Sequence, residues 1–178
     1  MGAVVLSSRR RPGSRWGLAW RARSLLLIAL VGSALGAPAG ARAQASPPGP
    51  PDAAGTSASA ATTEELRQAL TVATARFQAM DAAGVLAQVS ERYRNGPLTK
   101  ASIRDNLAAL FALYDAVKTS VRIDQVRMVD GAAWVYSTGE VSGRLRGLGV
   151  WTTALSWERE PEVARREGGS WRLTGPGP

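Results

Sequence analysis

The sequence contains no cysteine and no histidine, and these two absences exclude several kinds of chemistry. Without cysteine the chain forms no disulfide and offers no lipobox cysteine for a lipid anchor. Without histidine it has no Ser-His-Asp or Cys-His machinery, and zinc sites built from these residue types are excluded too. We therefore expect no metal, and any acid or base would be a carboxylate or a tyrosine.

Glycine-rich nucleotide-binding loops are also missing. Gly143, Gly147 and Gly149 have the wrong spacing for a dinucleotide or phosphate-binding fingerprint, and they follow no strand-to-helix turn. Lysine is scarce: only Lys100 and Lys118 occur, and neither lies in an apolar stretch of the kind that makes a lysine reactive. We expect no cofactor.

Acidic residues are absent before Asp52, and this N-terminal region has the features of a cleavable secretory signal. Arginines precede a short apolar run from Leu25 to Leu35, and the small-residue triplet ARA follows at residues 41–43. The run is shorter than the roughly 20 residues that cross a bilayer as a helix. We expect cleavage after Ala43 and export to the periplasm or the medium, with no stable membrane anchor afterwards.

Two other interpretations of this region are a mitochondrial transit peptide and a twin-arginine signal. Transit peptides are also rich in arginine and poor in acids, but they are amphipathic, whereas residues 25–30 are apolar all round. Ser8-Arg9-Arg10 suggests the twin-arginine route, but Arg11 and the Pro-Gly pair after it are not the apolar residues expected there.

The positive charge of the sequence belongs largely to the signal. Seven of the 22 Lys and Arg residues lie in residues 1–43, together with none of the 14 acids, so the rest of the chain carries 15 basic and 14 acidic residues. A nucleic-acid-binding protein needs a basic patch that survives processing. We therefore expect no nucleic-acid partner.

Composition divides the remaining chain into two parts. Residues 44–61 are rich in Pro, Gly, Ala, Ser and Thr, and Asp52 is the only charged residue among them. Such a segment buries too little apolar surface to offset the entropy of ordering, so we expect a disordered tether. Residues 62–178 have the size of one ordinary domain.

Apolar residues recur at helical spacing in three segments of this domain. Thr62 and Glu65 indicate a capping box before the first helix, Asp81 caps a second helix, and Thr99 begins a third after the Asn-Gly-Pro break at 95–97. The expected apolar faces comprise Leu66, Leu70, Ala73, Phe77 and Met80 in the first helix, Val85, Leu86 and Val89 in the second, and Ile103, Leu107, Leu110, Phe111 and Tyr114 in the third.

After Lys118 the apolar residues alternate as in β-strands. Residues 121–128 and 133–141 flank a hairpin turn at Asp130-Gly131, a glycine-rich bend follows, and Pro161 ends or interrupts the strand that begins at residue 151. A last strand covers residues 170–174. Three helices followed by an antiparallel meander predict an α+β fold with the helices packed on a curved antiparallel sheet.

Both faces of the 133–141 strand are largely apolar, which is unusual for an antiparallel sheet with one face in water. A second subunit would cover the outer face. The sequence therefore predicts a homodimer that associates through the sheet.

Three phrases of the domain resemble the nuclear transport factor 2-like superfamily, which includes ketosteroid isomerase and the SnoaL-like polyketide cyclases. They are RFQAMDAAGVLAQV between the first two helices, ASIRDNLAALF in the third, and GGSWRLTG in the closing strand. The resemblance covers nearly all of residues 62–175. It implies a cone in which the helices and the curved sheet enclose a pocket, and a dimer through the convex face of the sheet.

The sequence departs from the isomerase branch at its catalytic positions. The tyrosine donor of that branch aligns with Ala73, and the loop at residues 93–97 contains no carboxylate. The remaining candidates for acid–base roles are Asp81, Glu140 and Tyr136. Each has a structural alternative, as a helix N-cap, a strand-end charge and a tyrosine satisfied by a backbone carbonyl, respectively.

The aromatic residues indicate a binding role more than a catalytic one. Four tryptophans fall on predicted strands and can line an apolar pocket, although core and dimer contacts are the structural alternative. We expect an exported, non-enzymatic domain that dimerises and holds a small apolar ligand; a metal-free isomerase, cyclase or lyase and a protein-interaction module are the alternatives. The expected ligand-binding residues are Phe77, Tyr93, Phe111, Trp134, Tyr136, Trp151 and Trp157.

Overall fold

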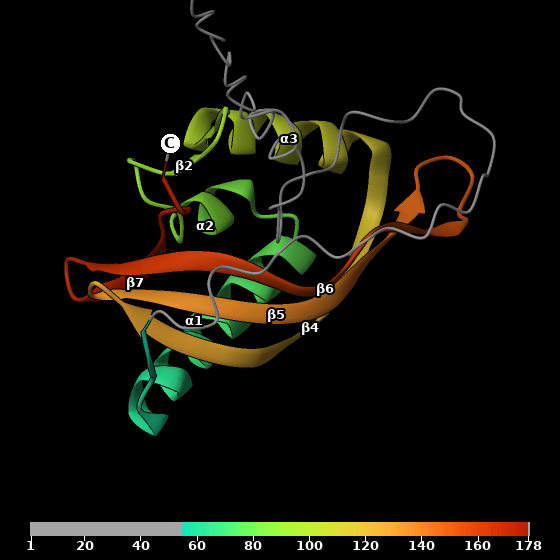
Figure 1. Ribbon diagram of the computed structural model, residues 1–178. Helices are drawn as coiled ribbons and strands as arrows, with labels where there is room; N and C mark the ends of the chain where they lie inside the picture. The colour runs from blue at the N-terminus through green and yellow to red at the C-terminus, as the bar shows by residue number, and fades with distance from the viewer. Residues whose placement is uncertain (1–54, 178) are drawn as a thin grey trace, which may run out of the picture.

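The computed structural model describes residues 55–177, which form helices packed on a curved antiparallel sheet (Figure 1). The predicted α+β fold class is confirmed. In chain order the elements are β1 (Thr56–Ser57), α1 (Ala60–Gln78), α2 (Ala82–Leu86), β2 (Arg94–Asn95), β3 (Leu98–Thr99), α3 (Lys100–Leu113), β4 (Tyr114–Val129), β5 (Ala132–Leu145), β6 (Trp151–Glu167) and β7 (Ser170–Leu173).

The main sheet has the order β1-β4-β5-β6-β7, and all its neighbours are antiparallel. Register shifts between Ile123 and Gln125 and between Ser137 and Gly139 mark β-bulges, which increase the twist of a sheet. At the second bulge a Cβ on Gly139 would lie 2.5 Å from the Trp157 ring, so the indole packs directly on the backbone. In Figure 1 the bent strands cover α1, while α2 and α3 lie above the β7 edge.

The hairpin between β4 and β5 confirms the predicted turn. Asp130 and Gly131 have φ angles of 49° and 74°. A two-residue type I′ turn requires φ above zero at both central positions, and Asp-Gly is among the pairs that adopt it most easily.

The predicted start of the first helix was wrong. The N-cap is Ser59, whose hydroxyl accepts a hydrogen bond from the Thr62 amide at 3.1 Å, so Thr62 lies inside the first turn. The preceding chain decides this position, because the Ala58 amide donates to the Val126 carbonyl of β4 and so sets where the helix begins. The other two predicted caps, Asp81 for α2 and Thr99 for α3, are confirmed.

The folded region also begins earlier than the composition indicated. Part of the expected tether, residues 55–61, contributes β1 and the first residues of α1. Thr56 and Ser57 pair with Met128 and Arg127, and the Arg127 guanidinium donates to the Gly55 carbonyl at 2.9 Å. The free edge of β4 thus orders a segment whose own composition carries no structural signal.

Two strand boundaries differ from the predictions. β4 begins at Tyr114, directly after α3, so Tyr114 is a strand residue rather than the last position of the helix face. Pro161 does not end β6, which continues to Glu167. Proline is tolerated there because β7 pairs only with residues 164–167, so that β6 is an edge strand at Pro161.

Two apolar clusters form the core. The larger one joins α1, α2 and α3 to the middle of the sheet, and the smaller one joins α1 to the ends of β4, β5, β6 and β7. The buried members of the larger cluster are Phe77, Val85, Val89, Tyr93, Ile103, Leu107, Leu110, Tyr114, Val117, Val141 and Trp157. Those of the smaller are Leu66, Val126, Ala133, Ala164 and Trp171.

The signal expected at residues 1–43 lies outside the described residues. Within residues 55–177, no helix has the length and apolar character needed to cross a bilayer.

Candidate functional site

An apolar cavity of about 100 Å³ lies between the helices and the inner face of the sheet. Side chains from α1, α2, the chain after α2, and strands β4 to β7 line it. Its apolar lining residues are Leu66, Ala69, Leu70, Ala73, Val85, Val89, Ile123, Val135, Ala164, Trp171 and Leu173, and the other three lining residues are Gln88, Glu162 and Arg172.

The space arises from small side chains on both walls. Ala69 and Ala73 line the cavity from α1. They follow buried Leu66 by three and seven residues, so helical spacing places all three side chains on the same face of the helix. Ala164 lies opposite them on β6. Alanine side chains are too short to fill the distance between a helix and a sheet, so a hollow is left where three of them meet.

The chain that follows α2 closes one end of the cavity. The Leu173 amide donates to the Gln88 carbonyl at 2.9 Å, and the Ser90 amide donates to the Leu173 carbonyl at 2.8 Å. Residues 88–90 therefore extend the sheet past β7. The Arg172 guanidinium donates to the Ala87 carbonyl at 3.0 Å, which fixes the end of α2 against the same edge.

Glu162 places a carboxylate in this apolar lining. Its residue is only 2% exposed, and it pairs with Val135 across β5 and β6. Because side chains alternate along a strand, Glu162 shares the inner face with Ala164, while Val163 points the other way. The position is unusual because glutamate is among the residue types that are least often fully buried.

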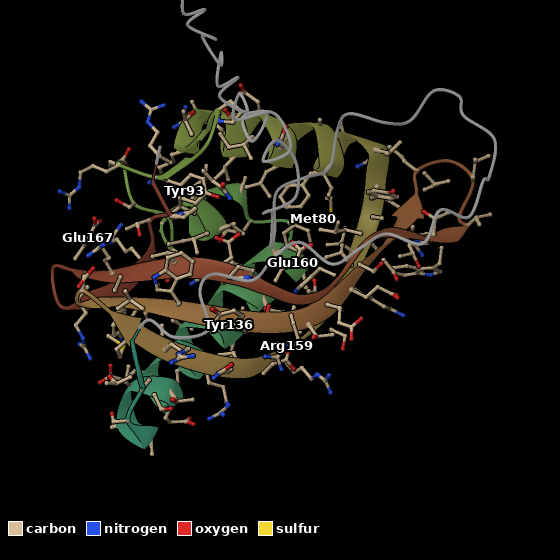
Figure 2. The ribbon with its side chains drawn as sticks, viewed as in Figure 1. Met80, Tyr93, Tyr136, Arg159, Glu160 and Glu167 are labelled. Carbon is tan, nitrogen blue, oxygen red and sulfur yellow. The ribbon has the colours of Figure 1, made fainter. Side chains whose placement is uncertain are left out.

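The Tyr93 side chain is buried, and the charge of the Glu162 carboxylate affects the pKa of its hydroxyl group. It is 1% exposed, and Figure 2 shows it beside α2 and β2, above the sheet. Burial, and after it the negative charge of Glu162, raise the pKa of Tyr93 well above the usual range, while a hydrogen bond with Asn95 acts in the opposite direction. Tyr93 therefore keeps its proton at neutral pH and can act only as a protonated hydroxyl.

None of the three acid–base candidates named from the sequence lines the cavity. The Asp81 carboxylate caps α2, accepting from the Gly84 amide at 2.8 Å. Glu140 is exposed and accepts from the Ser142 hydroxyl, on the opposite side of β5 from buried Val141. Tyr136, labelled on the sheet in Figure 2, alternates with buried Ser137 and so lies on the outer face.

The seven aromatic residues expected to bind a ligand also lie elsewhere. Phe77 and Phe111 contact each other in the core, with ring centroids 5.6 Å apart, and the buried Trp157 indole donates to the Ser137 hydroxyl at 3.1 Å. Trp134 is on the outer face with Tyr136, and Trp151 is 40% exposed beneath the Lys118 ammonium. Tyr93 is buried close to Glu162 but does not line the cavity itself.

Sequence reasoning missed Glu162 because it ended or interrupted the strand at Pro161. The available signal was the apolar pair Val163-Ala164 directly after the proline, which indicates that the strand continues. With the strand extended, period two would have placed Glu162 and Ala164 on one face.

The residues present do not suggest a metal centre. Among residues 55–177, no group of three or more Asp and Glu side chains is arranged to hold an ion. The chemistry available in the cavity is therefore apolar contact, the Glu162 carboxylate, the side-chain amide of Gln88 and the guanidinium of Arg172.

No family model matches the sequence, and no curated protein matches it either. Similar folds are found among solved structures. A scytalone dehydratase-like protein from Novosphingobium aromaticivorans is 10% identical, with a TM-score of 0.56 over 64% of this chain and 80% of its own. A conserved protein from Planctomyces limnophilus is 14% identical, with a TM-score of 0.54 over 64% of this chain and 91% of its own.

A third similar structure is a protein of unknown function with a cystatin-like fold from Nostoc punctiforme. It is 14% identical, with a TM-score of 0.51 over 67% of this chain and 90% of its own. At such identities the likeness concerns the path of the chain rather than the residues of any site. The helices on a bent antiparallel meander and these likenesses together confirm the predicted architecture: the chain has the nuclear transport factor 2-like, cystatin-like α+β fold.

Proposed function

We propose that this chain is an exported, non-enzymatic binding domain that holds a small, largely apolar molecule between α1 and the sheet. The observation that carries the proposal is the cavity, because eleven of its fourteen lining residues are apolar and the hollow is already formed in the free chain. Binding sites for small molecules are typically preformed, mostly apolar and supplied with a few polar groups that orient the ligand.

The size of the cavity limits the ligand. Pockets for drug-sized molecules measure about 300–1,000 Å³, and an apolar cavity of about 150 Å³ holds a benzene ring. A hollow of about 100 Å³ suits a short aliphatic chain or a single small ring rather than a polycyclic molecule. A carboxylate oxygen of Glu162 can accept a hydrogen bond, so a ligand that carries one hydroxyl or amine group would match the lining.

The first test is native mass spectrometry of the protein purified from its own cells, where a co-purifying small molecule would support the proposal. The second is a titration with phenol and with benzene, followed through the fluorescence of Trp171, which lines the cavity. Glu162→Gln should weaken the binding of phenol more than the binding of benzene. Glu158→Gln, at an exposed position of the same strand, is the matched control. Failure of both rings to bind would contradict the proposal.

A second candidate is a metal-free isomerase, cyclase or lyase, and one observation favours it. A carboxylate in an apolar surround is a common arrangement for a general base or acid, and the protonated Tyr93 hydroxyl is a nearby donor. Against it, Ala73 lines the cavity at the position where the isomerases that the sequence resembles carry a tyrosine. The catalytic role would therefore fall to Glu162 rather than to Asp81, Glu140 or Tyr136.

The two candidates differ in how they respond to Glu162→Gln. An enzyme would lose turnover of its substrate by at least about 100-fold, the usual contribution of a general acid or base, while the variant stays folded. A binding protein would show only a change in affinity. The co-purified molecule, or its close analogues, supplies the substrate for this comparison.

We also propose that the domain dimerises through the outer face of the sheet. Trp134 and Tyr136 lie there, and partly buried aromatic side chains are typical of subunit contacts. Arg122 lies on the same face, since it pairs with Thr138 beside Tyr136. Its guanidinium is paired with Asp124 at 3.0 Å, so it does not oppose association, and we expect a dimer in sedimentation measurements. A strictly monomeric chain in both low and high salt would contradict the dimer.

The proposal that the protein is exported depends only on the signal expected at residues 1–43. Sequencing the N-terminus of the protein taken from its own cells tests it: a mature chain that begins at Gln44 supports export, and a chain that keeps residues 1–43 contradicts it.

A further inference from the structure

A second hollow, of about 530 Å³, is lined in part by Tyr93, shares no lining residue with the apolar cavity and has the opposite character. It is bounded by the chain before β2, by the end of β3 and by the first turns of α3. Its lining residues are Glu91, Arg92, Tyr93, Arg94, Thr99, Lys100, Ala101 and Arg104, which we call the basic groove. Its volume is that of a pocket for a whole small molecule.

Positive charge is concentrated in the basic groove. It contains four cations and one acid, a local net charge of +3, whereas residues 55–177 together carry 15 basic and 13 acidic residues. The groove therefore holds more net charge than the whole described chain. A concave surface lined by one sign of charge concentrates counter-ions.

Two of the cations are not neutralised by the protein. Lys100 is paired with Glu91 at 2.7 Å, and Arg92 with Glu167 at 2.9 Å. Among residues 55–177, no ion pair includes Arg94 or Arg104, and both residues are exposed. Their guanidinium groups remain open to a ligand.

The groove's acid, Glu91, and the carboxylate paired with Arg92, Glu167, respond to this positive field. The Lys100 ammonium, with smaller effects of Arg104 and Arg172, lowers the pKa of Glu91. Hydrogen bonds from Arg92 and Ser90, with a smaller effect of Arg172, lower the pKa of Glu167. Both carboxylates therefore stay ionised at neutral pH, and a ligand would meet the cations that they leave unpaired.

The floor of the groove is held in place before any ligand binds. The Lys100 ammonium, whose side chain is only 12% exposed, also donates to the Val89 carbonyl at 2.9 Å. Thr99 forms a capping box with Ser102 at the start of α3. Because it is already fixed, Lys100 loses little conformational entropy when an anion binds beside it, which favours affinity.

We propose that the basic groove binds a small anion with at least two negative charges, such as a phosphate or a phosphate ester. The planar fork of each arginine matches the oxygens of such an anion in a bidentate contact. A phosphate dianion would offset the charge of Arg94 and Arg104 together. This site is separate from the apolar cavity, and neither proposal depends on the other.

The test is a calorimetric titration of the full domain with inorganic pyrophosphate at about physiological salt, where screening removes weak surface attraction. The double variant Arg94→Gln/Arg104→Gln should lower the affinity at least tenfold, which corresponds to a loss of about 1.4 kcal/mol of binding free energy. Arg159→Gln/Arg165→Gln removes the same charge from exposed positions on the sheet and should change the affinity less than about twofold. All four side chains lie outside the core, so unchanged urea midpoints are expected for both variants.

Two results would overturn the proposal. One is the absence of measurable heat with pyrophosphate at concentrations up to about 10 mM, a free energy below about 3 kcal/mol. The other is an equal loss of affinity in the two double variants, which would indicate a general effect of net charge. Flotation with vesicles that contain phosphatidic acid, whose headgroup is a phosphate monoester, distinguishes the sources of the anion. Retention that needs Arg94 and Arg104 identifies a lipid headgroup, and binding of pyrophosphate without retention identifies a free anion.

Discussion

Replacing Ala73 with leucine should both stabilise the domain and block its cavity. Ala73 lies on α1 at 8% exposure and lines the hollow of about 100 Å³. Unfilled core volume costs about 24 cal/mol per Å³, so complete filling would be worth roughly 2 kcal/mol. A leucine at one wall fills the space only in part, and cavity-filling changes usually gain about 0.5–2 kcal/mol. We therefore expect Ala73→Leu to raise the free energy of unfolding by about 1 kcal/mol.

The matched control is Ala75→Leu on the same helix. Ala75 is exposed, so Ala75→Leu changes the helix propensity by the same amount while its side chain does not reach the cavity. Urea unfolding followed by tryptophan fluorescence gives both free energies, and an unchanged slope would show that only stability has moved. Binding of xenon or benzene, which occupy apolar cavities, should be lost in Ala73→Leu and kept in Ala75→Leu.

Two outcomes would refute the reasoning about the cavity. If Ala73→Leu is less stable than Ala75→Leu by more than about 1 kcal/mol, the added methyl groups meet filled space, as in overpacked cores. If Ala73→Leu still binds xenon or benzene like the wild-type chain, the ligand occupies another place.

Three further predictions concern caps, packing and pH. Ser59→Ala removes the α1 N-cap and should lower the free energy of unfolding by about 1 kcal/mol in urea titrations; no change would mean that the cap lies elsewhere. Gly143→Ala should cost about 1–3 kcal/mol, because its Cβ would lie 2.3 Å from a ring carbon of buried Tyr114, and a neutral result would mean that the ring can move. The folded pKa of Glu167 is lowered chiefly by Arg92, so its contribution to stability is present above the unfolded value of about 4.3 and is lost as pH falls through the folded pKa. The urea midpoint should therefore fall less between neutral and acidic pH in Glu167→Gln than in the wild-type chain. An equal fall of the midpoint in both chains would contradict this.

The local sequence was a good guide where a structure depends on neighbouring residues. Asp130-Gly131 predicts its own turn, because these residues accept positive φ angles at low cost. Asp81 and Thr99 predict helix starts, since a cap bonds to an amide two or three residues away. The helical repeat through Leu66, Ala73 and Phe77 predicts the buried face of α1 for the same reason.

The predictions were less accurate where distant parts of the chain meet. Ser59 rather than Thr62 caps α1, because the segment before it pairs with β4. β6 continues through Pro161, because β7 is too short to pair with it there. Neither partner strand is close in sequence, so no local pattern reports its length or position.

The candidate site depended on tertiary structure most of all. Composition by itself excluded disulfides and histidine chemistry, and it limited any acid or base to a carboxylate or a tyrosine. Which carboxylate faces the cavity depends on strand register, since a shift of one residue moves every side chain to the opposite face. The bulge in β6 opposite Ser137 and Gly139 and the continuation past Pro161 place Glu162 inside, whereas the regular alternation of β5 makes Glu140 and Tyr136 point outwards.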